Sequence, residues 1–137
     1  MSTLNNQKFY INGQWVNPNS VQMLDVINPA NENIITQITN GNEQDLNNAV
    51  KAAKDSFETW SVSSVEKRLK LLINLRDIYQ KRFNEMTVAI TTEMGCPRDF
   101  SSDVQTQSGL DHLNDFIEQL KNFNFENKFN EKSNNYI

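Results

Sequence analysis

One cysteine, Cys96, and one histidine, His112, are the side chains best suited to nucleophilic or metal chemistry in this chain. A nucleophilic thiolate needs a base and oxyanion donors nearby. His112 is the single imidazole available, and no acyl-transfer motif surrounds Cys96. One cysteine also excludes an internal disulfide, and one Cys with one His cannot form a zinc cage. We therefore expect a loop or packing role for Cys96 and a solvated or hydrogen-bonded helical position for His112.

The composition limits the classes of partner. The chain has 137 residues, enough for one domain, with 37% hydrophobic and 22% charged residues and a net charge of -4. Lys and Arg are scattered among Asp and Glu, so a phosphate backbone meets no positive stripe. The N-terminus has no apolar targeting region, and no apolar run approaches the ~18 residues of a membrane span. We expect a cytoplasmic chain with neither nucleic acid nor membrane among its partners.

Short extended segments dominate the first forty residues. Asn12 and Gly13 separate apolar residues 9–11 from 15–16. Both tolerate the positive φ of a type I′ turn, which predicts a two-residue β-hairpin. Further strands are expected over 21–27, ended by Asn28-Pro29, and over 34–38.

The apolar period changes from that of a strand to that of a helix at Asn42. Asn42 with Asp45 is the expected N-cap, and apolar residues then recur at helical spacing as far as Trp60. A second helix is expected from Ser63, with Glu66 completing a capping box. Its apolar residues form two stripes that need cover on two sides. One stripe contains Val65, Leu69, Leu72, Tyr79 and Phe83, and the other contains Leu71, Leu75 and Ile78.

The second half of the chain reads as further helix. Helical spacing runs through 86–94, Gly95 takes the expected left-handed position after the helix, and Pro97 prevents continuation. A last helix is expected from about Ser101 to Asn122. The expected organisation is a flexible N-terminus over 1–7, a folded portion over 8–122, and a linker over 123–137 that ends in the start of a strand.

Several segments in a fixed order resemble the N-terminal part of NAD(P)-dependent aldehyde dehydrogenases. They are YINGQWV at 10–16, VINPA at 26–30, FETW at 57–60, EKR at 66–68 and TEMGCP at 92–97. Their order and spacing carry the resemblance, which covers nearly all of residues 8–137. It implies an α+β fragment, with a β-hairpin and short strands followed by three to four helices. In the intact family this fragment opens the α/β Rossmann-like cofactor domain, and 123–137 would begin an oligomerisation strand.

The resemblance also implies an activity for the intact enzyme, the oxidation of an aldehyde to a carboxylic acid with NAD or NADP. In that family a thiolate attacks the carbonyl, and the resulting thiohemiacetal gives hydride to the nicotinamide. The dinucleotide-binding segment, the general-base glutamate and the nucleophilic cysteine of the family match no position here, Cys96 included. We therefore expect no catalytic or cofactor-binding residue, no bound cofactor and no activity in this chain alone. The intact family forms homodimers or homotetramers.

The resemblance assigns possible binding roles to four residues. The Glu93 carboxylate and a backbone carbonyl near Ile27 would bind a structural sodium or potassium ion, because hard cations prefer oxygen ligands. The alternative is a solvated glutamate near a helix C-terminus. Val104 and Ser108 lie four apart on one helix face and map along the aldehyde entry tunnel. The alternative for them is ordinary packing and solvent exposure.

A second function also fits the residues. The two apolar stripes of the helix over 63–83 suggest a non-catalytic helical interaction module that docks on intact dehydrogenase subunits.

Overall fold

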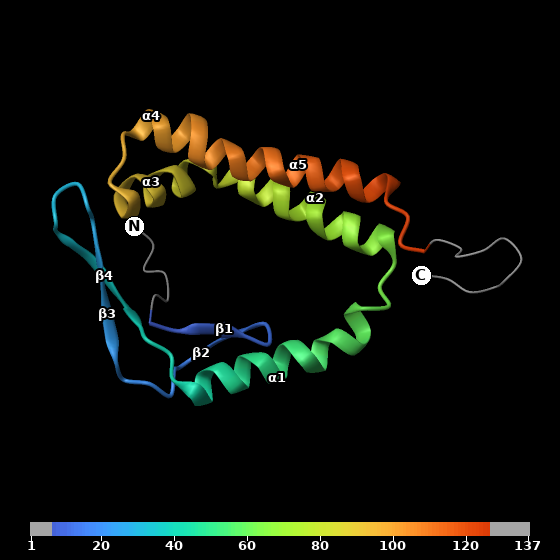
Figure 1. The fold of residues 1–137 in the computed structure, drawn as a ribbon, viewed down its shortest axis with the longest axis horizontal. Coiled ribbons are helices and arrows are strands. Elements are labelled where there is room, and N and C mark those ends of the chain that lie inside the picture. The colour runs from blue at the N-terminus through green and yellow to red at the C-terminus, as the bar shows by residue number, and fades with distance from the viewer. Residues whose placement is uncertain (1–6, 127–137) are drawn as a thin grey trace, which may run out of the picture.

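The computed structural model of the chain describes residues 7–126 (Figure 1). Two separate antiparallel strand pairs come first and helices follow, which confirms the expected α+β class. The elements are β1 (Phe9–Ile11), β2 (Gln14–Val16), β3 (Met23–Ile27), β4 (Ile34–Thr39), α1 (Glu43–Trp60), α2 (Val65–Lys81), α3 (Phe83–Met94), α4 (Arg98–Phe100), the π-helical η1 (Ser101–Thr106) and α5 (Gln107–Asn122). The strand predicted at the end of the chain, over 134–137, lies outside the described residues.

The β1–β2 hairpin has the predicted turn. Phe9 pairs with Val16, and Ile11 pairs with Gln14. Asn12 and Gly13 between them have φ values of 52° and 76°. Positive φ at both central residues gives the turn the twist that matches the paired strands.

The β3–β4 pair begins two residues later than the sequence suggested. Its ladder runs from Met23, opposite Thr39, to Ile27, opposite Ile34, with an irregularity between Val26 and Ile27. The preceding residues bend, since the Gln22 amide donates to the Ser20 hydroxyl over 3.1 Å. Val21, which the predicted strand included, is therefore outside the ladder.

Helix α1 begins at the predicted cap. The Asn42 side chain accepts from the Asp45 amide over 3.0 Å, and the Asp45 carboxylate accepts from the Asn42 amide over 3.1 Å. This reciprocal pair satisfies two amide groups that the first turn of a helix leaves without a partner.

The N-cap of α2 is Ser64, so the prediction of Ser63 was wrong by one residue. The Ser64 hydroxyl accepts from the Lys67 amide over 3.3 Å. Ser63 instead donates to the Trp60 carbonyl over 2.6 Å and accepts from Arg68 Nε over 3.0 Å. Adjacent serines offer the same cap chemistry, and contacts with the end of α1 decide between them.

Helix α3 ends as predicted, at a left-handed Gly95 with φ 66°. The helix that follows differs from the prediction of one regular helix from Ser101. It starts with the short α4, passes through the six-residue π-helical segment η1, and becomes α-helical at Gln107. A π-helical turn inserts one extra residue and rotates everything that follows it.

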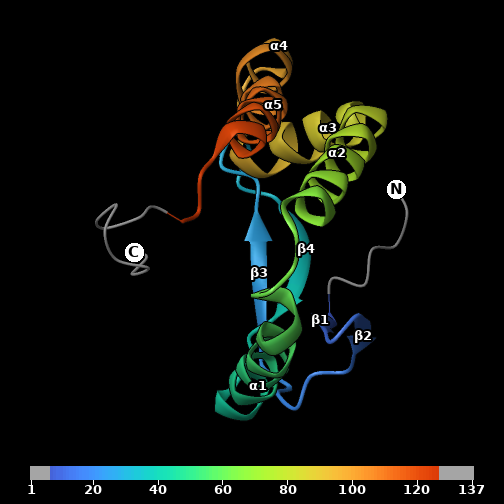
Figure 2. The same cartoon turned by 90° about the vertical axis from the view of Figure 1, so that its right-hand side faces the viewer.

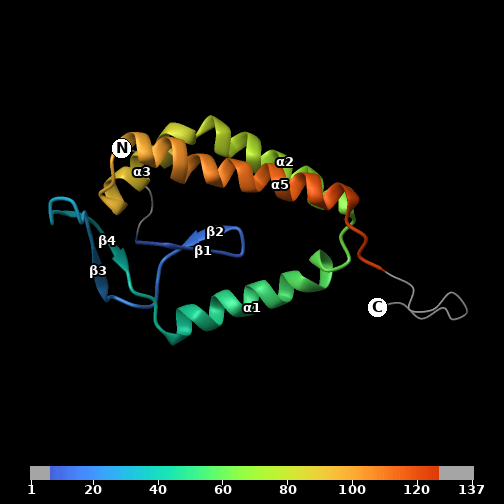
Figure 3. The same ribbon diagram turned by 45° about the horizontal axis from the view of Figure 1, so that its top comes forward.

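The helices lie in two groups. Helices α2 and α5 run side by side, whereas α1 lies apart from them next to the β1–β2 hairpin (Figures 1 and 3). The β3–β4 pair spans the distance between the two groups (Figure 2). Ile117 on α5 is the single buried large apolar side chain among residues 7–126. No helix in this described range has the length and apolar character needed to cross a bilayer.

Candidate functional site

The two short segments at 28–30 and 93–97 meet in space. Gly95, at the end of α3, lies against the β3–β4 turn, and a Cβ atom added to Gly95 would come within 2.7 Å of the Ala30 amide nitrogen. The Asn28 side chain holds this turn by accepting from the Ala30 amide over 2.9 Å. Glycine is therefore required at position 95 both for its positive φ and for its close approach to backbone.

The residues proposed for a monovalent cation, Ile27 and Glu93, flank this contact. Ile27 ends β3 next to the strand irregularity and is exposed, and Glu93 is exposed in the last turn of α3. The Glu93 carboxylate has no hydrogen bond or ion pair within the described part of the chain, so its oxygens stay available. Residues 7–126 contain no cluster of three His, Cys, Asp or Glu side chains arranged for a metal. The contact at Gly95 brings the two segments together, and the cation role of Ile27 and Glu93 stays a prediction.

Within residues 7–126, the side chains with no exposed surface carry hydroxyl groups. Ser101 and Thr106 have no exposed surface, and Thr87 is 3% exposed. The Thr87 hydroxyl donates to the Phe83 carbonyl over 3.0 Å and lies 3.1 Å from the Thr106 hydroxyl. We call Tyr79, Thr87, Ser101 and Thr106 the hydroxyl cluster.

The hydroxyl cluster forms around η1 and explains its π-helical geometry. The Thr106 hydroxyl donates to the Ser101 carbonyl, five residues earlier, over 2.8 Å, and Tyr79 from α2 donates to the Thr106 carbonyl over 3.0 Å. Burial raises the pKa of the Tyr79 hydroxyl, which keeps it a neutral donor. Because buried polar groups are costly without partners, these bonds fix the helical register at this point.

The two residues proposed for the aldehyde tunnel are joined directly. Val104 lies in η1 with 44% of its surface exposed, and the Ser108 hydroxyl in the first turn of α5 donates to the Val104 carbonyl over 2.6 Å. The hydroxyl cluster therefore sets where this stretch of helix lies. The role of Val104 and Ser108 in an aldehyde tunnel stays a prediction.

Helices α2 and α5 approach each other closely next to the hydroxyl cluster. Gly109 follows Ser108, and a Cβ atom there would lie 2.4 Å from the Tyr79 hydroxyl. A side chain at position 109 would displace the tyrosine from the Thr106 carbonyl. Sequence reasoning missed this role of Gly109, because nothing in the local helix pattern points to a residue thirty positions away.

Cys96 and His112 do not form a catalytic pair. The half-exposed thiol of Cys96 lies 2.9 Å from the Ser101 hydroxyl, which links it to the hydroxyl cluster. His112 is exposed on α5 and forms no hydrogen bond within residues 7–126. A nucleophile, a base and an orienting group are not assembled in this part of the chain.

Asp45 joins the start of α1 to the loop after the β1–β2 hairpin. It is 5% exposed, and its carboxylate accepts from the Asn19 amide over 2.7 Å, the Asn19 side-chain nitrogen over 2.9 Å and the Ser20 amide over 3.2 Å. The Asn19 backbone bond is the main cause that lowers the pKa of Asp45. Sequence reasoning found the cap role of Asp45 and missed these bonds.

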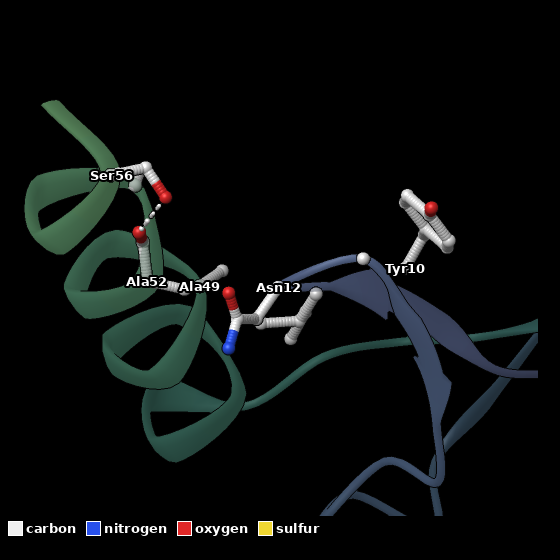
Figure 4. A pocket seen from close by; sticks show the side chains of 8 residues that line it. Tyr10, Asn12, Ala49, Ala52 and Ser56 are labelled. Atoms are coloured by element: carbon white, nitrogen blue, oxygen red, sulfur yellow. Dashed lines mark hydrogen bonds between the residues drawn. The ribbon is translucent and has the colours of Figure 1, made fainter. Parts of the chain in front are cut away.

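The hairpin covers one side of α1 only loosely. A groove of about 310 Å³ lies between them (Figure 4). Small residues of α1, among them Ala49 and Ala52, line one wall, and the hairpin residue Asn12 lies across from them. A second groove of about 630 Å³ lies between β1 and the first turns of α1. Both grooves are open. Tyr10 lines both of them, and Glu43 and Asp45 also line the second.

A sequence model of the aldehyde dehydrogenase family matches residues 15–137. A relative from Staphylococcus epidermidis that is named as an aldehyde dehydrogenase is 44% identical over 119 residues, which are 87% of this chain and 25% of the relative. A similarly named relative from Staphylococcus aureus is 39% identical over 121 residues, 88% of this chain and 26% of its own length.

Solved structures agree with the sequence match. An aldehyde dehydrogenase from Bartonella henselae has a TM-score of 0.89 and 36% identity, covering 94% of this chain and 27% of its own. Aldehyde dehydrogenase C from Pseudomonas syringae, in complex with NAD+ and octanal, has a TM-score of 0.87 and 30% identity, covering 91% of this chain and 26% of its own.

This chain belongs to the aldehyde dehydrogenase family. It spans about a quarter of the length of the curated relatives that it matches, and that quarter is their N-terminal part.

Proposed function

We propose that this segment builds the opening part of the cofactor domain of an enzyme that oxidises an aldehyde to a carboxylic acid, with NAD as hydride acceptor. The observation that carries the proposal is the TM-score of 0.89 with a solved aldehyde dehydrogenase, over nearly the whole of this chain and 27% of the other. The complex of the Pseudomonas syringae relative with NAD+ and octanal supports the choice of cofactor and substrate class.

We also propose that residues 1–137 alone have no dehydrogenase activity. Within the described residues, the single thiol contacts a serine hydroxyl and has no base beside it. Hydride transfer further needs a bound nicotinamide held against the reacting carbon. The role of the segment is then structural. Through the hydroxyl cluster it positions Val104 and Ser108, and at the contact near Gly95 it positions Ile27 and Glu93 for a sodium or potassium ion.

We propose a homodimer or homotetramer for the enzyme that contains this segment, and a cytoplasmic location. The net charge of -4 supports the expectation that nucleic acid is not a partner.

Two proteins test the proposal. The first is the purified chain of 137 residues, incubated with NAD+ and octanal. We expect no NADH formation above that of a Cys96→Ala variant. The second is a chimera in which this chain replaces the matched segment of the Staphylococcus epidermidis relative. We expect the chimera to form NADH, because the segment supplies fold and not chemistry. A folded but inactive chimera, or Cys96-dependent activity of the chain alone, would contradict the proposal.

A further inference from the structure

Helix α1 carries a stripe of large apolar side chains that are mostly exposed, although the Arg68 guanidinium lies 5.8 Å from the centre of the Trp60 ring. The residues recur at spacings of three, four and seven, which places them on one face of the helix. They are 43% to 65% exposed. We call Leu46, Val50, Phe57 and Trp60 the α1 stripe.

The β1–β2 hairpin reaches the α1 stripe at Leu46, which lines the groove beside β1. The hairpin faces an adjacent side of the helix, which is built from small residues. That side contributes Ala49, Ala52, Ala53 and Ser56 to the groove shown in Figure 4. Within residues 7–126, the hairpin thus leaves Val50, Phe57 and Trp60 more than two-fifths exposed.

Helix α2 repeats this arrangement. Of its two predicted apolar stripes, the one that contains Leu69, Leu72 and Tyr79 is partly covered, and α5 packs on α2. The other stripe, formed by Leu71, Leu75 and Ile78, is 48% to 53% exposed. The sequence predicted that α2 needs cover on two sides, and within residues 7–126 one of these sides is covered.

The exposed apolar surface is not confined to these two stripes. Within residues 7–126, exposed large apolar side chains run from Tyr10 to Phe125. Monomeric soluble proteins seldom expose apolar patches of more than a few hundred Å², and larger ones mark interaction sites.

We infer that the α1 stripe and the exposed α2 stripe form a docking surface for the rest of an aldehyde dehydrogenase polypeptide, and that this surface binds the rest when it is supplied as a separate chain. The inference rests on the proposed function for the identity of the partner. The Bartonella henselae structure contains the same fold as about a quarter of a longer chain. A soluble protein rarely leaves such stripes in water, so the other three quarters are the natural cover.

Binding between separate chains is feasible because the segment needs little rearrangement. A TM-score of 0.89 means that it already has the conformation found within the longer chain. A partner that is preorganised loses less conformational entropy on association. An intact subunit, in contrast, already contains its own copy of this segment and has no free site.

Co-expression tests the inference. The tagged chain of 137 residues is expressed with the Staphylococcus epidermidis relative from which the matched N-terminal segment has been deleted. We expect the two to co-purify in equal amounts. Phe57→Glu and Leu75→Glu each place a carboxylate in an apolar contact, and we expect the recovered partner to fall about tenfold or more.

A matched control separates docking from folding. Asn48 lies midway between Leu46 and Val50 in sequence and so on the opposite face of α1. Asn48→Glu adds the same charge to the same helix, and we expect full recovery of the partner. Circular dichroism of each free variant should match that of the parent chain, because the substituted side chains are exposed.

Several results would overturn the inference. One is the absence of co-purification, and another is recovery of as much partner with Phe57→Glu as with the parent chain. The others are binding to the intact relative as strong as to the truncated one, and a dimer of this chain that Phe57→Glu dissociates. The test also separates the two proposals. An active chimera without binding of separate chains would support the proposed function and contradict docking. Binding of separate chains with an inactive chimera would support docking and contradict the proposed function.

Discussion

The region around η1 and the region around α1 are built by opposite means. Around η1, the hydroxyl cluster satisfies its own polar groups, and the best-buried side chains of the molecule lie there. Around α1, the N-terminal cap is complete, but the large apolar residues face outward. The first region finishes its interactions within residues 7–126, whereas the second prepares a surface that needs another polypeptide.

The difference shows that local order and tertiary completeness are separate properties. Helix α1 has a capping box, favourable spacing and 18 residues, which suffice to define it. Most of the stability of a helix in a protein nevertheless comes from packing of its apolar face. In this chain α1 has the cap, spacing and length that define a helix, but its large apolar residues are mostly exposed.

The largest expected effect on stability comes from substituting two glycines with positive φ. Gly95 precedes η1, and Gly13 lies in the hairpin beside α1. Gly95→Ala places a methyl group 2.7 Å from the Ala30 amide nitrogen in addition to the strain of its φ, whereas Gly13→Ala meets nothing within 4 Å. We expect Gly95→Ala to lower the free energy of unfolding by about 3 kcal/mol and Gly13→Ala by about 1 kcal/mol. Urea unfolding measures both. Equal losses would show that the contact with the β3–β4 turn contributes nothing.

A smaller effect is expected from acid, through Asp45. In the folded chain the pKa of the Asp45 carboxyl is lowered below its ordinary value, mainly by the bond from the Asn19 amide. The stabilisation is therefore complete above the unfolded pKa and is lost as the pH falls through the folded pKa. We expect Asp45→Asn to be less stable than the parent chain at neutral pH, because an amide cannot accept all of these bonds.

Unfolding curves recorded from neutral pH down to about pH 2.5 measure this effect. The stability difference between the parent and Asp45→Asn should shrink as the acid protonates Asp45. A difference that stays constant over this range would exclude the carboxylate as the acid-sensitive link between α1 and the preceding loop.

The sequence predicted those features that neighbouring residues determine. The Asn12-Gly13 turn, the Asn42 cap and the Gly95 stop each depend on chemistry within a few positions, and all three are confirmed. The α+β class and the family followed from the order of these features. The two apolar stripes of α2 were also visible as a pattern.

The features that escaped prediction depend on distant residues. The choice of Ser64 over Ser63 depends on contacts with Trp60 and Arg68. The π-helical turn at Ser101–Thr106 depends on Tyr79 and Thr87, which lie on other helices. No periodicity within one helix reports such bonds, and a single inserted residue in the helix is invisible to a pattern of spacing.

Amide hydrogen exchange on the isolated chain tests the contrast between the two regions most directly. Exchange reports the free energy of local opening for each amide. We expect the slowest exchange in α3, η1 and the adjoining turns of α2 and α5, and exchange in α1 that is faster by about tenfold or more. Protection of α1 equal to that of η1 would show that α1 is already stabilised within this chain, and would contradict the account of an uncovered surface.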